Sequence, residues 1–221
     1  MYSLFMQYNE VLVTGGTGLA GQHVCRALIE AGMLPRLFVR PGSEEKVPEE
    51  IRNRCRTTLG DLTVREFAEQ AAQGTSAIVH IAGTWKESPK EGITFEEAIV
   101  HATRNVLHAA REWGIRRVVQ VSVAGAQPGA PVPFLDAKGR AEEMVRGSGI
   151  DWTVFRPAPW YDLRDGKPLA SAAYLQSLAA AVADALGRED TFGRSFEAEG
   201  SDRFPWERRS SPLPALATMQ E

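Results

Sequence analysis

Short apolar runs rich in β-branched residues alternate along the chain with longer segments whose apolar residues recur at helical spacing. The run AIVHIA at residues 77–82 is apolar on both alternating faces except at His80, which is typical of strands that helices cover on both faces. The predicted strands are residues 11–14, 36–39, 56–59, 76–82, 117–123, 152–155 and 194–198. The predicted helices lie near residues 18–31, 64–72, 95–113, 134–147 and 172–187. This alternation predicts an α/β fold with a doubly wound parallel sheet.

Residues at the ends of these helices support the prediction. A threonine precedes a glutamate by three positions at Thr63 and again at Thr94, which predicts a capping box at two helix starts. Gly32 and Gly114 stand where two helices should end, because glycine accepts the left-handed conformation of a C-terminal cap.

The length and composition of the chain indicate one folded domain. Its 221 residues are 43% hydrophobic, which is enough to bury a substantial core. We expect residues 1–200 to form a single domain. Residues 201–221 are rich in Pro, Ser and Arg, so we expect a loosely ordered extension there.

Charge and hydropathy narrow the class of partner. The formal net charge is −3 with Lys and Arg scattered, which argues against nucleic acid or an anionic membrane as the main partner. Residues 169–186 are rich in alanine but carry Gln176 and Asp184, so they predict an amphipathic helix and no membrane span. The N-terminus has no basic region followed by an apolar run, which predicts no signal peptide and a cytoplasmic location.

The cysteines and histidines indicate no metal site. Cys25 and Cys55 are far apart in sequence and form no CxxC pair, so we expect two ordinary cytosolic thiols. His101 and His108 are seven residues apart on one predicted helix, and no third ligand is near them in sequence.

The clearest chemical motif is TGGTGLAG, residues 14–21, directly after the first predicted strand. Its glycines allow a tight turn and close approach of backbone N–H groups to a pyrophosphate, which the start of the next helix also attracts. The strand before it and the helix after it are the context that supports a dinucleotide site. The alternative is a glycine-rich turn without a ligand. The candidate contacts are Gly15, Gly16, Thr17, Gly18, Leu19 and Gly21.

Arg40 ends the second predicted strand, at the position that distinguishes the two nicotinamide cofactors. An acidic residue there suits the ribose 2′-hydroxyl of NAD, whereas an arginine suits the 2′-phosphate of NADP. A charge-assisted contact contributes about 1.5–3 kcal/mol. We therefore favour NADP(H), with NAD(H) as the alternative if Arg40 is only a solvated loop charge.

Further short segments carry a family resemblance. They are VRPGS (39–43), GDL (60–62), HIAG (80–83), TRNVLHAA (103–110), AKGRAEE (137–143) and WTVFRP (152–157). With the glycine loop, they resemble the short-chain dehydrogenase/reductase superfamily in its extended and atypical branches, the NAD-dependent epimerase/dehydratase-like and NmrA-like proteins. The chain looks closest to the atypical group that includes the 39 kDa accessory subunit of respiratory complex I. The resemblance covers residues 10–160 closely and 172–200 loosely.

This resemblance implies a Rossmann fold and a set of cofactor contacts. The implied contacts are Asp61 and Leu62 at the adenine, Ala82 and Gly83 beside the ribose and pyrophosphate, Lys138 at the nicotinamide ribose, and Pro157 beside the nicotinamide ring.

The positions that move protons in this family carry other residues here. Phe134 stands four residues before Lys138, where the family has its catalytic tyrosine. Val123 follows Ser122 where a second serine is usual, and Ile99 stands at the position of a helix asparagine. Lys138 alone remains of the four, unless a register shift of one residue brings Ser122 into the serine's place.

Two functional hypotheses follow. A general acid contributes about 10²–10⁴ in rate, so without it the reduction of a ketone by the usual route would be severely impaired. Tyr161 could replace the missing acid, although the alternative is an ordinary packed side chain. Only 64 residues follow Pro157, and the predicted helix and last strand use many of them, so we expect a reduced substrate region. The chain is then either a reductase whose acceptor needs no enzyme acid, such as a flavin, quinone or linear tetrapyrrole, or a non-catalytic nucleotide-bound sensor or assembly subunit with a protein partner.

Overall fold

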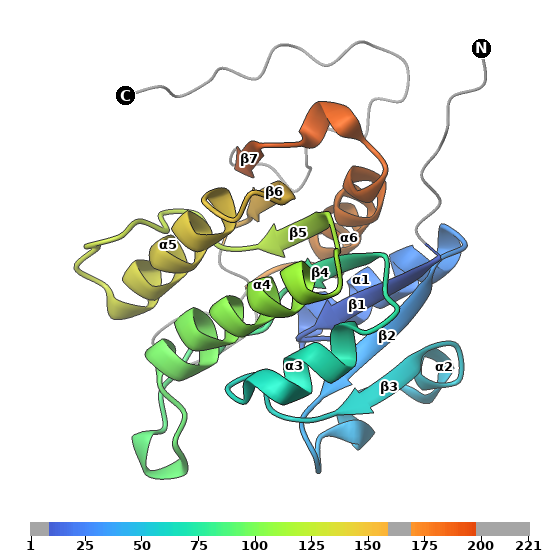
Figure 1. Cartoon of the computed structure of the whole chain (residues 1–221), viewed down its shortest axis with the longest axis horizontal. Coiled ribbons are helices and arrows are strands. Elements are labelled where there is room, and N and C mark those ends of the chain that lie inside the picture. Colours follow the sequence, from blue (N-terminus) through green and yellow to red (C-terminus); the bar gives the residue numbers. More distant parts are fainter. Residues whose placement is uncertain (1–8, 159–168, 198–221) are drawn as a thin grey trace.

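The computed structural model describes residues 9–158 and 169–197, in which seven strands form one parallel sheet (Figure 1). The strand order is β3-β2-β1-β4-β5-β6-β7. The strands are β1 (Glu10–Thr14), β2 (Leu34–Val39), β3 (Arg56–Leu59), β4 (Ala77–His80), β5 (Arg117–Val121), β6 (Asp151–Arg156) and β7 (Arg194–Glu197). The prediction of a doubly wound α/β sheet is confirmed, and each predicted strand is present.

Helices cover both faces of the sheet. Helices α3, α4 and α5 lie on the face toward the viewer of Figure 1, and α1 and α6 pack together on the opposite face. The helices are α1 (Leu19–Glu30), α2 (Glu49–Arg52), α3 (Arg65–Ala72), α4 (Ala102–Glu112), α5 (Pro133–Arg146) and α6 (Ala172–Leu186). Short turns named η1 (Glu44–Lys46), η2 (Pro89–Glu91), η3 (Glu96–His101) and η4 (Glu189–Thr191) complete the described elements.

The two helical layers explain why the central strands are apolar throughout. In β1, Val11 and Val13 belong to the core cluster beneath α1 and α6. Leu12 points the other way and packs into the cluster beneath α3 and α4. Neither face of such a strand meets water, so neither needs polar residues.

Glycine ends two helices as predicted. Gly32 has φ +81°, and Met33 N–H donates to the carbonyl of Leu28 at the end of α1. Gly114 has φ +65°, and Ile115 N–H donates to the carbonyl of Ala110 at the end of α4. These bonds satisfy carbonyl groups that lack a partner within the helix.

The predicted helix starts need correction. The N–H of Glu97 donates to Thr94 Oγ1 at 3.1 Å, so one of the two bonds of that capping box forms. Thr63 caps no helix, because α3 begins later, at Arg65, with Val64 as its N-cap. The Thr63 N–H and hydroxyl instead both donate to Asp61 Oδ1 at 2.9 Å. The helix predicted over 95–113 begins with a π-helical turn, η3, which the hydrophobic pattern did not indicate.

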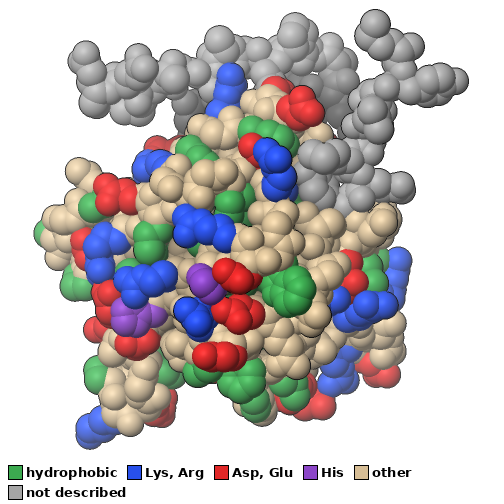
Figure 2. Space-filling model, viewed as in Figure 1, with side chains coloured by type: hydrophobic (Ala, Val, Ile, Leu, Met, Phe, Trp, Pro, Cys, Tyr) green, Lys and Arg blue, Asp and Glu red, His purple; other side chains and the backbone are tan. Residues whose placement is uncertain are grey.

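The described face of the molecule shows no gathering of one sign of charge. Figure 2 shows Lys and Arg side chains interleaved with Asp and Glu side chains over the face that α3, α4 and α5 cover. Within residues 9–158 and 169–197, no helix has both the length and the apolar character needed to cross a bilayer.

Candidate cofactor-binding site

Two cavities of about 400 Å³ each lie beyond the carboxyl ends of the central strands and merge into one groove. They share Gly15, Thr17, Arg40, Ala82, Gly83, Thr84 and Ile93. Strand β1 lies between β2 and β4, so the chain order reverses beside it. A crevice at such a reversal is where open α/β sheets bind ligands.

The two cavities differ in charge, and we name them accordingly. The acidic cavity contains the three carboxylates Asp61, Glu91 and Glu97. The cationic cavity is lined by Arg40, Lys46, Lys86 and Lys138, and none of the described residues that line it is acidic. None of these four cations forms an ion pair with a described residue, whereas nine arginines elsewhere in the described chain do.

The glycine loop forms the floor that both cavities share. Gly15 has φ +78°, and a Cβ there would lie 2.8 Å from the backbone nitrogen of Ala82. A Cβ on Gly21 would overlap the carbonyl oxygen of Gly15. Backbone crowding therefore requires glycine at both positions, as the motif predicts. Gly16 lines neither cavity, because it faces Leu37 of β2 behind the loop.

The start of α1 is open toward the cationic cavity. Gly18 is its N-cap in an extended conformation, no side chain caps the helix, and no acidic residue lies in its first turn. Gly18 and Leu19 both line the cavity. Uncapped N–H groups at a helix start attract an anion, so this end fits a pyrophosphate.

A glutamine positions a lysine that sequence reasoning missed. Gln22 Nε2 donates to the carbonyl of Thr17 at 3.2 Å and to the carbonyl of Lys46 at 3.0 Å. These bonds fasten η1 to the glycine loop and bring Lys46 to the rim of the cationic cavity beside Arg40. No local pattern marks such a contact, because 24 residues separate its two ends.

The segment after β3 borders the acidic cavity as predicted. Asp61 and Leu62 both line it. Asp61 accepts two hydrogen bonds from Thr63, and Asn105 Nδ2 donates to the carbonyl of Leu62 at 2.7 Å. These contacts fix the loop in place.

A buried hydrogen-bond chain holds the strand ends beneath Ala82. His80 Nδ1 lies 2.7 Å from Thr14 Oγ1, and His80 Nε2 lies 2.9 Å from Thr103 Oγ1. Thr103 gives its proton to the carbonyl of Ile99, so His80 Nε2 must carry the proton and Nδ1 must accept from Thr14. Burial, with the positive charge of Lys138, lowers the pKa of His80 to about 3, so the ring stays neutral.

Lys138 reaches the cationic cavity from α5. The residue is 6% exposed, and its Nζ lies 3.3 Å from where a Cβ on Gly83 would be. It makes no hydrogen bond or ion pair with any described residue. Burial lowers the pKa of Lys138 to about 8, and Glu142 opposes part of this shift. An unpartnered amine in the groove fits a ligand that carries hydroxyl or anionic oxygens.

The positions that the resemblance assigns to proton transfer gather around this lysine. Phe134 and Val123 line the cationic cavity, and Ile99 Cγ1 lies 3.4 Å from where a Cβ on Gly83 would be. The Phe134 ring packs on Phe95 with centroids 5.7 Å apart. Neither Phe134, Val123 nor Ile99 offers a proton.

Of the two weaker candidates, only Ser122 lies in the described chain. It lines the cationic cavity, and its buried Oγ has no hydrogen-bond partner there. Tyr161 lies outside the described residues. Pro157 lines neither cavity but accepts a hydrogen bond from the N–H of Ala124 at 2.8 Å, beside the strand end that carries Ser122.

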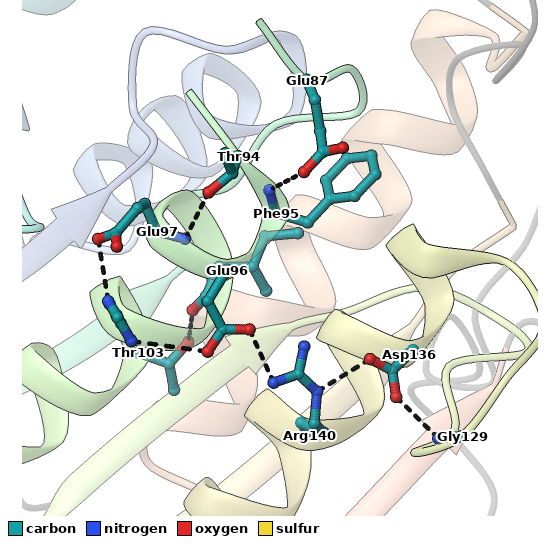
Figure 3. A network of polar contacts seen from close by, with 11 residues as sticks. Glu87, Thr94, Phe95, Glu96, Glu97, Thr103, Gly129, Asp136 and Arg140 are labelled. Carbon is teal, nitrogen blue, oxygen red and sulfur yellow. Dashed lines mark hydrogen bonds and ion pairs between the residues drawn. The ribbon is translucent and has the colours of Figure 1, made fainter. Parts of the chain in front are cut away.

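A polar network secures α5 against η3 (Figure 3). Arg140 lies between Glu96 at 2.8 Å and Asp136 at 2.9 Å, and Asp136 also accepts from the N–H of Gly129 at 2.7 Å. Glu87 accepts from the N–H of Phe95 at 2.8 Å. Because α5 carries Phe134 and Lys138, the network fixes these two side chains relative to the groove.

Two histidines of this region lie against carboxylates. His101 Nδ1 pairs with Glu97 at 2.9 Å, and His108 Nε2 with Glu69 at 3.0 Å. Among the described residues, no three His, Cys, Asp or Glu side chains form a group that could hold a metal ion.

Known proteins resemble this chain in sequence and in fold. A ceramide reductase of Caulobacter vibrioides is 29% identical over 159 residues, covering 72% of this chain and 49% of its own. The mitochondrial NADH-ubiquinone oxidoreductase 40 kDa subunit of Neurospora crassa is 25% identical over 167 residues, covering 68% and 44%. A short-chain dehydrogenase/reductase of Veillonella parvula, solved with NADP, superposes with a TM-score of 0.65 at 18% identity, covering 89% and 99%.

The chain spans half or less of the length of the first curated relatives it matches. Its likeness to the solved structures is a likeness of fold. The family model described as NAD(P)H-binding matches residues 15–185, which include the glycine loop, both cavities and most of α6. The chain therefore belongs to the NAD(P)H-binding family.

Proposed function

We propose that the chain binds NADP(H) along the groove and is a reductase whose acceptor requires no proton from the protein. The observation that carries the proposal is the cationic cavity. It holds a buried, unpartnered Lys138 beside Phe134, with no carboxylate among its described lining residues. Such a site suits a bound polyanion and a hydride acceptor, and it offers no hydroxyl at the tyrosine position.

The groove residues fit the parts of a nicotinamide dinucleotide. Asp61 and Leu62 would border the adenine, and the glycine loop with the uncapped start of α1 would hold the pyrophosphate. Lys138 would donate to the hydroxyls of the second ribose, and Pro157 would lie near the nicotinamide. When bound, the reduced nicotinamide supplies a hydride.

Arg40 supports a preference for NADP(H). It borders both cavities, is exposed, and forms no ion pair with a described residue, so it is available for a 2′-phosphate. Lys46, fastened by Gln22, adds a second positive charge nearby. A site that prefers NAD would instead usually place a carboxylate after β2 to bind the ribose 2′-hydroxyl.

The acceptor class follows from the missing acid. Loss of a general acid raises a barrier by roughly 3–5 kcal/mol, which makes reduction of a ketone slow. A flavin, quinone or linear tetrapyrrole can take hydride without that assistance. Apolar side chains of Leu19, Ile81, Val123 and Phe134 line the cationic cavity and would contact such a planar molecule.

A second candidate function is a non-catalytic subunit whose shape depends on bound nucleotide. The observation that favours it is the similarity to the Neurospora protein, which is named as one 40 kDa subunit of an NADH-ubiquinone oxidoreductase. The same replacements at Phe134, Val123 and Ile99 are compatible with it.

The experiment that separates the two follows NADPH consumption by absorbance in the presence of a flavin, a quinone and a linear tetrapyrrole. The reductase proposal expects oxidation with at least one acceptor, loss of that activity in Lys138→Met, and full activity in the control Lys90→Met. Lys90 lies on η2 and lines neither cavity. NADPH that stays bound and unreacted with all three acceptors would contradict the reductase and support the subunit.

A further inference from the structure

The two cysteines, 30 residues apart in sequence, come close enough in the folded chain for their thiols to interact. Cys25 lies in α1 and is 0% exposed. Cys55 follows α2, is half-buried, and packs against the core cluster that contains Cys25. Both are free thiols. The expectation of two separate, ordinary thiols does not anticipate this pairing.

The two thiols differ in reactivity. A hydrogen bond with Cys55, together with burial, raises the pKa of Cys25 well above its ordinary value. The same hydrogen bond, with the charge of Arg54, lowers the pKa of Cys55. The thiolate is the reactive form of cysteine. Cys55 is therefore the accessible nucleophile, and Cys25 is a protonated thiol beside it.

Cys25 also supports the glycine loop. Its Sγ lies 3.7 Å from where a Cβ on Gly16 would be, on the side where the Leu37 side chain also packs. These two side chains form the surface on which the loop rests. Movement of Cys25 Sγ toward Cys55 would open a gap beneath Gly16, and a well-packed interior does not fill such gaps without cost.

We propose that Cys25 and Cys55 form a reversible disulfide when a hydroperoxide oxidises Cys55, and that this bond weakens nucleotide binding. Cys55 thiolate attacks the terminal peroxide oxygen, the O–O bond breaks, and an alcohol leaves with a proton while Cys55 becomes a sulfenic acid. Cys25 sulfur then attacks Cys55 sulfur, the S–O bond breaks, and water leaves with the Cys25 proton. The two sulfurs lose two electrons to the peroxide, and a thiol reductant restores them.

The test uses the full chain treated with a stoichiometric hydroperoxide. Intact mass should show the loss of two hydrogens, peptide mapping should join Cys25 to Cys55, and Cys55→Ser should abolish the bond. NADPH affinity should fall roughly three- to tenfold on oxidation, equivalent to about 0.7–1.4 kcal/mol, and recover with a thiol reductant. The Cys55→Ser chain should keep its affinity throughout.

Two results would overturn the proposal. One is a Cys55 that oxidises to sulfinic acid while Cys25 stays a free thiol. The other is a complete disulfide with unchanged NADPH affinity. The expected effect on NADPH affinity rests on the proposed function, whereas the disulfide measured by mass does not. A reduced chain that binds no NADPH would therefore contradict the cofactor proposal, and the mass measurement would still decide whether the disulfide forms.

Discussion

The acidic and cationic cavities share a floor and differ in nearly everything else. The acidic cavity places Asp61, Glu91 and Glu97 around a space that suits neutral donors such as hydroxyls and amino groups. The cationic cavity places Lys46, Lys86 and Lys138, with Arg40 at the boundary, and no carboxylate is among its described lining residues. Away from Arg40, a phosphate would be repelled by the first cavity, whereas the second would attract it. The charge pattern therefore gives the groove a direction along which one end of a dinucleotide fits each cavity.

Within the cationic cavity, the residues suited to bind a cofactor are present, whereas the side chains that would transfer a proton are not. The cationic cavity has the positive charge that holds a cofactor, but Phe134, Val123 and Ile99 give it no group to move a proton. Cofactor contacts are backbone features and single charges, which tolerate change around them. Proton transfer needs several side chains acting together, and losing one makes the others less useful.

A substitution in the glycine loop, which forms the floor of both cavities, should reduce NADPH affinity the most. In Gly15→Ala, the new Cβ meets the backbone of Ala82 at a φ of +78°, so the loop must shift and both cavities change shape. NADPH affinity should fall by more than about 100-fold, measured by fluorescence titration. The control is Gly187→Ala, where a Cβ meets nothing within 4 Å; it should bind as the parent does. A Gly15→Ala chain with parental affinity would contradict the site.

The pH dependence of stability tests whether the buried amine of Lys138 has a lowered pKa. Burial lowers the pKa of Lys138 to about 8 from its ordinary 10.5. Below pH 8 the folded and unfolded chains are both protonated, so the cost of burial is fully present. Between pH 8 and 10.5 the folded chain loses its proton first, so the free energy of unfolding should rise with pH by about 3 kcal/mol.

Urea denaturation of the parent and of Lys138→Met across this pH range measures the effect. The difference between the two curves removes the contribution of other titrating groups, and the rise should be absent in the variant. Parallel curves would mean that the amine is solvated and keeps its ordinary pKa.

A substitution of Arg40 tests its proposed contact with the 2′-phosphate of NADP(H). Arg40→Ala should weaken NADPH binding about 10- to 100-fold, because a charge-assisted contact is lost, and should leave NADH binding unchanged. Arg104→Ala is the matched control, since Arg104 is exposed on α4, borders neither cavity and forms no ion pair within the described chain. Equal losses for both cofactors would place Arg40 away from the 2′-phosphate.

Phe134 should give the smallest effect on binding. Phe134→Tyr adds one hydroxyl at the edge of the cationic cavity, so NADPH affinity should stay within about twofold. No carbonyl reductase activity should appear, because Val123 and Ile99 still lack polar groups. Adding Val123→Ser is expected to produce the first measurable activity. Full activity in Phe134→Tyr alone would show that the remaining positions matter less than we infer.

Local sequence patterns predicted the parts of the site that depend on one segment. The glycine loop, the strand ends and the caps at Gly32 and Gly114 each follow from a few neighbouring residues. The contacts that join distant segments were missed: the Thr14–His80–Thr103 chain, the fastening of Lys46 by Gln22, and the interaction of the Cys25 and Cys55 thiols. The Thr63 cap was predicted wrongly because Asp61 accepts the Thr63 N–H that Glu66 would accept in a capping box, and spacing alone cannot reveal this competition.

The most direct test of the account is a paired titration of the reduced chain with NADPH and NADH, read by quenching of tryptophan fluorescence. Trp85 lines the cationic cavity and should report occupancy, so Trp85→Phe should reduce the signal without loss of affinity by calorimetry. The account predicts saturable binding of both cofactors, with NADPH about 10- to 100-fold tighter. Equal affinity would contradict the role of Arg40, and no binding of either cofactor would contradict the central claim that this groove holds a nicotinamide dinucleotide.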